Sequence, residues 1–147
     1  MNSSRPKDIS CLDVEIINRQ SADVDTRPLV EIVRRIVADA GYTHGEISMA
    51  IVDDPTIHQL NRQYLQHDYS TDVLSFVFEA IDSHLEGEII VSAETARRNS
   101  VEYNQTLQNE IMLYAIHGAL HLVGYEDSTA QGSDRMRKAE QQYLRGG

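Results

Sequence analysis

The sequence predicts a single α/β (α+β) domain in which about five helices pack on a small mixed four-stranded sheet. Its 147 residues suffice for one domain but not for two. Segments with the two-residue alternation of strands and segments with helical spacing follow one another in the order β-α-β-α-β-β-α-α-α. The hydrophobic content of 41% and the charged content of 24% are those of an ordinary globular protein and exclude a disordered chain, a collagen-like repeat or a coiled-coil rod.

Three features of the chain bear on its location. No apolar run approaches the ~18 residues needed to cross a bilayer, so we do not expect an integral membrane protein. Residues 1–10 are polar, lack the apolar region of a secretory signal and are predicted to form a flexible tail before one domain over 11–147. Cys11 is the only cysteine and cannot form an internal disulfide, which favours a reducing cytoplasm.

The first half of the chain is expected to form two strand–helix units. Residues from Cys11 onward alternate between polar and apolar, as in a half-buried strand. Pro28 in a first turn and Gly41 after the last apolar position bound a helix with apolar residues at helical spacing. Residues 46–52 are predicted as the second strand, and the Asp-Asp-Pro-Thr sequence at 53–56 caps a second helix. That helix carries four spaced apolar and aromatic residues: Ile57, Leu60, Tyr64 and Leu65.

The second half is expected to form two consecutive strands and then three helices. The strands are predicted at residues 71–78 and 87–91, separated by a polar loop around 82–84. The helices are predicted over about 92–99, 106–123 and 131–144. Ser92 is expected to cap the first helix, and Gly124 to end the second, which is the longest apolar helix.

The charge of the chain is strongly acidic and unevenly distributed. The net charge is −10, and the segment 38–94 contains 11 acidic residues and a single base, Arg62. The rest of the chain is balanced, with 12 acids and 12 bases. Because an acidic surface repels nucleic acid, a function on nucleic acid requires a specific site.

The richest chemistry lies at the end of the longest apolar helix. His117 and His121 are four residues apart, so both imidazoles project from one helix face and can ligate one divalent metal. Gly124 allows the chain to turn back and deliver a third ligand from Asp127 or Glu126. Two histidines with one carboxylate leave a position open for water, as in catalytic metal sites. Two histidines on a helix can also form an ordinary polar stripe, but this helix is otherwise apolar.

The spacing HxxxHxxGxxD resembles the metzincin protease pattern HExxHxxGxxH. The glutamate that serves as general base in those proteases is replaced by Gly118 here. The chain therefore lacks the group that would deprotonate the attacking water, and a metalloprotease is disfavoured.

The segment 117–127, HGALHLVGYED, resembles the HGxLHLxGYDH signature of YbeY-type endoribonucleases, which are rRNA maturation factors. The resemblance extends over about residues 45–144. Three other blocks match the family in order: Leu60-Asn61-x-x-Tyr64, STDVLSF at residues 70–76, and GEIIVS at residues 87–92.

The resemblance implies a metal-dependent, zinc-containing endoribonuclease that is specific for single strands and acts in ribosomal RNA processing and ribosome quality control. It implies a cytoplasmic protein whose residues 11–147 form one YbeY-like metallohydrolase domain, with the metal helix packed on the sheet at the cleft. The implied partners are ribosomal RNA, the ribosomal subunit, and ribosomal or GTPase proteins. The implied metal ligands are His117, His121 and Asp127, and the two histidines with Arg62 and Ser75 are the expected catalytic residues. For Ser75, an ordinary strand serine is an equally good interpretation.

The chain departs from the family pattern at two positions. The family's third ligand is histidine, whereas this chain has Asp127, which zinc also accepts. The family has an arginine after the tyrosine of the Leu-Asn-x-x-Tyr block, whereas this chain has Leu65, which cannot hold phosphate oxygens. Arg62 lies one helical turn earlier and is expected to contact the phosphate instead. Leu65 and the acidic surface favour an alternative function, a ribosome-associated assembly factor with a structural metal and little nuclease activity.

Several other residues have two interpretations. Asp72 is expected either to orient a metal ligand or to cap a turn, and the turn cap is favoured. Glu110 is expected either to support a metal ligand or to be a solvated helix residue, and the solvated residue is favoured. The basic clusters at 97–98 and 135–138 contact phosphate or balance the acidic surface. Tyr125 is expected to pack under the turn. Three histidines lack ligand spacing and are expected at the surface: His58, His67 and His84.

Overall fold

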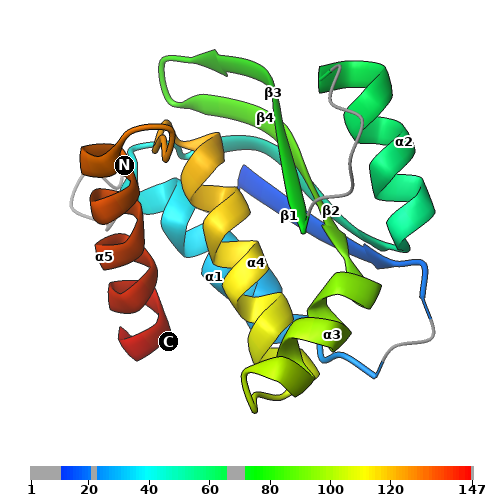
Figure 1. The fold of residues 1–147 in the computed structure, drawn as a ribbon. Helices are drawn as coiled ribbons and strands as arrows, with labels where there is room; N and C mark the ends of the chain where they lie inside the picture. Colours follow the sequence, from blue (N-terminus) through cyan, green and yellow to red (C-terminus); the bar gives the residue numbers. More distant parts are fainter. Residues whose placement is uncertain (1–10, 21–22, 66–71, 147) are drawn as a thin grey trace.

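The computed structural model describes residues 11–20, 23–65 and 72–146, so the predicted tail at 1–10 lies outside the described residues. The elements follow the predicted order, and the predicted fold class is confirmed. Along the chain they are β1 (Cys11–Asn18), α1 (Arg27–Asp39), β2 (His44–Val52), α2 (Asp54–Leu65), β3 (Val73–Ile81), β4 (His84–Ser92), α3 (Ala93–Glu102), α4 (Leu107–Leu122) and α5 (Ala130–Gly146) (Figure 1).

The sheet has the strand order β1-β2-β4-β3. Strands β1, β2 and β4 are parallel to one another, and β3 pairs with β4 in an antiparallel hairpin, so β3 forms an edge. Helix α1 connects the parallel strands β1 and β2, as a crossover between parallel strands requires. The sheet is therefore mixed, as predicted.

The two faces of the sheet are covered differently (Figure 1). Helices α1 and α4 lie on one face with α3 and α5 beside them, and the main core forms there. Buried strand residues of that core include Leu12, Met49 and Ile89. Helix α2 covers only part of the other face, through a small cluster around Ile57 and Ile90.

Helix α4 lies directly on the sheet beside β3 and β4. The hydroxyl of Thr106 caps its N-terminus by accepting a hydrogen bond from the Asn109 N–H at 3.0 Å. A Cβ atom at Gly118 would lie 2.5 Å from Cγ2 of Ile89 and 3.1 Å from Cγ1 of Val73, so only glycine permits this approach. After the helix, Gly124 takes φ +106°, the left-handed conformation that turns the chain back.

The β3–β4 hairpin is longer than the sequence predicts. The polar loop expected around 82–84 is a two-residue turn, Asp82 and Ser83, and His84 is already the first residue of β4. Asp82 has φ 53°, a left-handed conformation that aspartate tolerates, which permits the tight turn. A register shift between Val77 and Glu79 leaves Phe78 as a bulge.

Among the residues described by the structure, no helix is both long and apolar enough to cross a membrane.

Candidate metal centre

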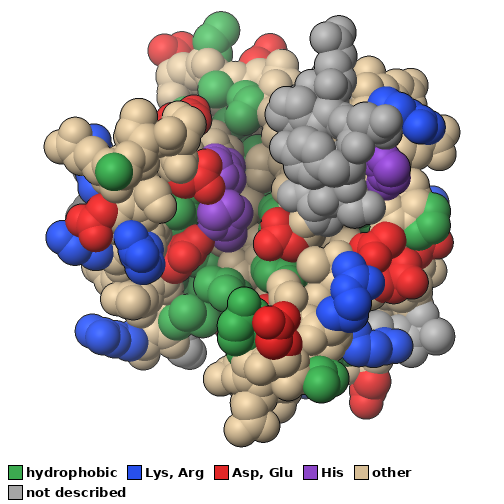
Figure 2. All heavy atoms as spheres, in the orientation of Figure 1, with side chains coloured by type: hydrophobic (Ala, Val, Ile, Leu, Met, Phe, Trp, Pro, Cys, Tyr) green, Lys and Arg blue, Asp and Glu red, His purple; other side chains and the backbone are tan. Residues whose placement is uncertain are grey.

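The last two turns of α4 carry His117 and His121 on one side of the helix. Their Nε2 atoms lie 3.1 Å apart, and the two rings meet edge to face at 78° with centroids 4.6 Å apart. About a quarter of each side chain is exposed, 28% for His117 and 26% for His121. Figure 2 shows a hollow on this face of the molecule in which histidine side chains lie between acidic ones.

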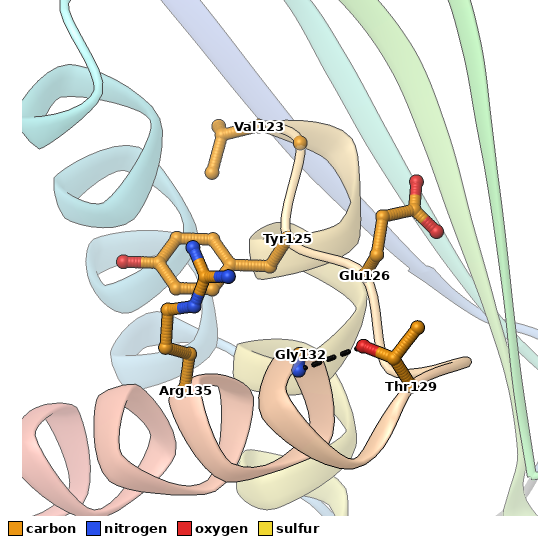
Figure 3. A pocket seen from close by; sticks show the side chains of 7 residues that line it. Val123, Tyr125, Glu126, Thr129, Gly132 and Arg135 are labelled. Atoms are coloured by element: carbon orange, nitrogen blue, oxygen red, sulfur yellow. Dashed lines mark hydrogen bonds between the residues drawn. The ribbon is translucent and has the colours of Figure 1, made fainter.

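Asp127 reaches the two imidazoles from the loop between α4 and α5. Its Oδ2 atom lies 3.5 Å from Nε2 of His117 and 3.5 Å from Nε2 of His121. The ligand atoms of these three residues all lie within 4.8 Å of one another. The neighbouring Glu126 lines a cavity of about 400 Å³ with Tyr125 and Arg135, and it projects from the loop on the side opposite to Tyr125 (Figure 3).

The second ring nitrogen of each histidine has its own partner. Nδ1 of His117 lies 2.5 Å from Oε2 of Glu140, and Nδ1 of His121 lies 3.0 Å from the backbone oxygen of Tyr125. A carboxylate and a carbonyl oxygen only accept hydrogen bonds, so both Nδ1 atoms carry hydrogen. The electron pairs of the neutral rings therefore lie on the two Nε2 atoms, which face each other and Asp127.

This arrangement fits a divalent metal ion. Two nitrogen electron pairs and a carboxylate oxygen that converge within 3.1–3.5 Å repel one another unless a cation or a proton lies between them. Two imidazoles with one carboxylate form a common ligand set for transition metals, and hydrogen bonds at the distal ring nitrogens orient such ligands. The residues present thus match what a bound metal requires.

The charge on His117 is governed by its surroundings. Burial of the His117 ring lowers its pKa by disfavouring the charged imidazolium. The hydrogen bond with Glu140 and the negative charges of Glu140, Asp127 and Asp72 act in the opposite direction and are stronger, so the pKa of His117 is raised above its ordinary 6.5. A proton therefore competes for the same electron pair that a metal would use.

Sequence reasoning missed Glu140. It lies 23 residues after His117 on another helix, so no local spacing joins the two. The signal that could have found it is an acid beside the buried stripe of α5, next to Met136 and Ala139. An acid at the border of an apolar helix face is expected to have a partner there.

Glu110 is not the solvated helix residue that the sequence favours, because only 7% of it is exposed. Burial, together with the negative charge of Asp72, raises the pKa of its carboxyl group. Asp72 precedes β3, and its backbone oxygen accepts the Ser92 N–H at 3.0 Å. Its charge also contributes to the raised pKa values of Glu110, of His117 and of Tyr114, the last of which is about 12.

The other two expected catalytic residues have different surroundings. The hydroxyl of Ser75, on β3, donates to the backbone oxygen of Gly118 at 2.9 Å and so links the edge strand to the metal helix. Arg62 lies in the last turn of α2, which packs on the opposite face of the sheet from α4, and its side chain is exposed. The side chain of Leu65 and all of His67 lie outside the described residues.

The close packing around Gly118 explains the missing protease base. Atoms of Ile89, Val73 and Ser75 lie within 3.3 Å of the place that a Cβ atom would take at this position, so a glutamate side chain has no room there. The absence of the metzincin glutamate is therefore a consequence of how α4 sits on the sheet.

A second group with metal-ligand geometry lies at the exposed end of the hairpin. His84 Nε2 is 2.9 Å from Oε2 of Glu86 and 3.4 Å from Oε1 of Glu79. The sequence places no other histidine at ligand spacing from His84. The pairing of β3 with β4 instead places the two carboxylates next to it.

The predicted phosphate-binding clusters are partly engaged in ion pairs. Arg98 donates to Asp54 at 2.9 Å, and Lys138 pairs with Asp134 at 3.1 Å. Arg97 lines a shallow exposed depression, and Arg135 lines the cavity beside Tyr125 (Figure 3).

Comparison with known proteins decides the family. The model of the family described as Endoribonuclease YbeY matches residues 15–146. The chain belongs to the YbeY family. It is 36% identical over 132 residues to the endoribonuclease YbeY of Salinibacter ruber, with 84% of each chain covered. The YbeY protein of Rhodopirellula baltica is 42% identical over 115 residues, which cover 75% of this chain and 59% of that protein.

A solved structure agrees with the fold. The solution structure of TM1509 from Thermotoga maritima matches with a TM-score of 0.60 and 26% identity, over 90% of this chain and 86% of that one. The two chains therefore share a fold over most of their lengths.

Proposed function

We propose that this YbeY-family chain is a metal-dependent endoribonuclease that hydrolyses phosphodiester bonds in single-stranded RNA during ribosomal RNA processing. The observation that carries the proposal is the convergence of two imidazole electron pairs and a carboxylate oxygen in a solvent-accessible hollow. The printed names of its relatives, endoribonuclease YbeY, support the reaction.

His117, His121 and Asp127 would hold the ion, and two nitrogen donors with one oxygen donor favour zinc. A bound divalent ion would supply Lewis-acid chemistry, lowering the pKa of a coordinated water and offsetting charge on the phosphate. Asp127, which is 42% exposed, leaves the hollow open to a substrate. Glu140 and the Tyr125 carbonyl hold the two imidazoles in the orientation this requires.

Arg62 and Ser75 have different proposed roles. We propose that Arg62 contacts a phosphate of the bound RNA other than the scissile one, because α2 packs on the opposite face of the sheet from the metal helix and because Leu65 cannot donate. The Ser75 hydroxyl donates its proton to the Gly118 carbonyl, so we assign it to holding α4 against β3. The ribosomal subunit, with ribosomal or GTPase proteins, completes the proposed set of partners, and the cytoplasm is the proposed location.

The test is cleavage of a single-stranded RNA oligonucleotide by the purified chain after metal removal and after reloading with zinc, manganese or magnesium. We expect cleavage only with metal, no cleavage of the same sequence as a duplex, and no digestion of casein. The His121→Ala variant should lose both metal and cleavage. A chain that binds metal tightly but leaves RNA intact would contradict the nuclease and favour the assembly factor with a structural metal.

A further inference from the structure

We propose that Glu140 is a positioning residue for the metal centre: its carboxylate fixes the tautomer and direction of the His117 ring and so ties α5 to the metal site. The inference rests on the proposed function only in that a metal binds at His117, His121 and Asp127.

The contact itself is short and partly buried. Oε2 of Glu140 lies 2.5 Å from Nδ1 of His117, and the two side chains are 17% and 28% exposed. Hydrogen bonds between a carboxylate and a ring N–H are stronger than neutral ones and directional. The carboxylate therefore determines which ring nitrogen carries hydrogen and where the other one points.

Glu140 has no competing cationic partner. Within 11–20, 23–65 and 72–146, no lysine or arginine forms an ion pair with it, whereas Asp134 on the same helix pairs with Lys138 and Arg137. A carboxylate that is largely removed from water is costly unless a donor satisfies it, and His117 is that donor.

A firmly seated helix delivers the carboxylate. Met136 and Ala139, which precede it on α5, are buried in the main core with α4. The position of Glu140 is therefore set by packing, which is what a group that orients a metal ligand requires.

The two metal-binding histidines are supported in the same way from the chain that follows α4. The Tyr125 carbonyl holds Nδ1 of His121, and Glu140 holds Nδ1 of His117. A side-chain substitution does not remove the Tyr125 carbonyl. Of the two hydrogen bonds made by the histidine rings, only the one to Glu140 can therefore be tested by mutation.

The experiment measures zinc affinity by competition with a chromophoric chelator, using the full chain. Glu140→Ala should weaken zinc binding by about 10–100-fold, the usual effect of losing such a partner. Glu140→Gln should stay within a few-fold of the natural chain, because its amide oxygen still accepts from Nδ1. Asp134→Ala removes the same charge from the same helix without touching His117, and should leave the affinity unchanged.

A spectroscopic readout separates positioning from simple anchoring of α5. In metal-free protein, at a pH raised until the His117 ring signals stop changing, long-range ¹H–¹⁵N spectra should show hydrogen on Nδ1 of His117 in the natural chain and in Glu140→Gln. Glu140→Ala should shift the hydrogen toward Nε2.

Three results would overturn the proposal: unchanged zinc affinity in Glu140→Ala, an equal loss in Glu140→Ala and Glu140→Gln, or an unchanged tautomer in Glu140→Ala. If Glu140→Ala fails to fold, Glu140→Met, which fills a similar volume without an acceptor for Nδ1, replaces it in all three comparisons. A natural chain that binds zinc but does not cleave RNA contradicts the nuclease and leaves this inference standing.

Discussion

Each imidazole of the metal centre turns Nδ1 to an acceptor and Nε2 to Asp127. Three atoms with free electron pairs, the two Nε2 atoms and a carboxylate oxygen of Asp127, therefore point at the same place, where a metal ion would bind. Removing any of them should change metal binding more than it changes the fold, because all three are partly exposed.

Asp127→Ala should release most of the metal, whereas Asp127→His should retain it, because histidine supplies an equivalent donor from the same loop position. Glu126→Ala is the control, since Glu126 belongs to the neighbouring cavity (Figure 3). Elemental mass spectrometry of the purified variants measures their metal content and checks this assignment. Loss of metal in Glu126→Ala with full content in Asp127→Ala would reverse the assignment.

The raised pKa of His117 predicts how the metal-free chain responds to pH. Burial alone would lower this pKa, but the hydrogen bond with Glu140 reverses the direction. A raised folded pKa stabilises the fold fully below the unfolded value of about 6.5, and that gain is lost as pH rises through the folded pKa. The stability advantage of the natural chain over His117→Gln, measured by thermal unfolding with chelator, should therefore grow as pH falls from 8 toward 5.5. A constant difference would contradict this.

Residue spacing made part of this site predictable. His117, His121 and Asp127 lie within 11 residues of one another, and a helix followed by a turn fixes their relation. Glu140 could not be predicted in the same way, because its contact depends on how two helices pack.

The elements around the site are held by close contacts between α4 and the sheet. Gly118→Ala should destabilise the fold by about 1–3 kcal/mol, because its new methyl group would meet Cγ2 of Ile89 at 2.5 Å. Urea unfolding measures the loss. Adding Ile89→Ala should recover part of it in a double-mutant cycle, and strictly additive effects would show that the two residues do not clash.

The start of α2 is tied to the start of α3. The Asp54 carboxylate accepts from the hydroxyls of Ser92 and Thr95 and from Arg98, while the Asp54 N–H donates to Glu94 at 2.6 Å. Burial opposes the charge of Asp54, but these hydrogen bonds outweigh it and lower its pKa.

Asp54→Asn should therefore cost about 1.5–3 kcal/mol of unfolding free energy at neutral pH. A lowered folded pKa gives stability that is present above the unfolded value of about 3.8 and is lost as pH falls through the folded pKa. The difference between natural chain and variant in chemical denaturation should accordingly shrink in acid. A difference that persists unchanged down to pH 2 would exclude the carboxylate as its source.

Helices were predicted more closely than the hairpin. Caps such as Ser92 and Thr106 and the glycine at 124 mark helix ends locally. The lengths of β3 and β4 depend instead on their mutual register, including the bulge at Phe78, which no local pattern encodes.

At the scale of the whole molecule, a row of acidic side chains crosses one face of the sheet. Asp13, Glu46, Glu86 and Glu79 lie opposite one another across all four strands, on the face away from α4. The sequence predicted the excess charge, but only the register aligns these four carboxylates. RNA is therefore expected to avoid this row of carboxylates.

Glu46→Gln should stabilise the fold, because Glu46 has an acid directly opposite on each side and each such pair costs about 0.2–1 kcal/mol. Sodium chloride should raise the melting temperature of the natural chain by screening this row, and should raise that of Glu46→Gln less. Melting curves between 0.05 and 0.5 M salt compare the two. Identical salt responses would show that the row stores no repulsion.

The contact between His117 and Glu140 also determines when, during synthesis of the chain, the metal site becomes aligned. A ribosome makes α4 before α5, so the growing chain contains every metal ligand before it contains the carboxylate that orients one of them. If Glu140 acts as proposed, a nascent chain that ends before α5 holds a poorly aligned centre. The aligned centre would then form only after α5 has been made and has packed against α4.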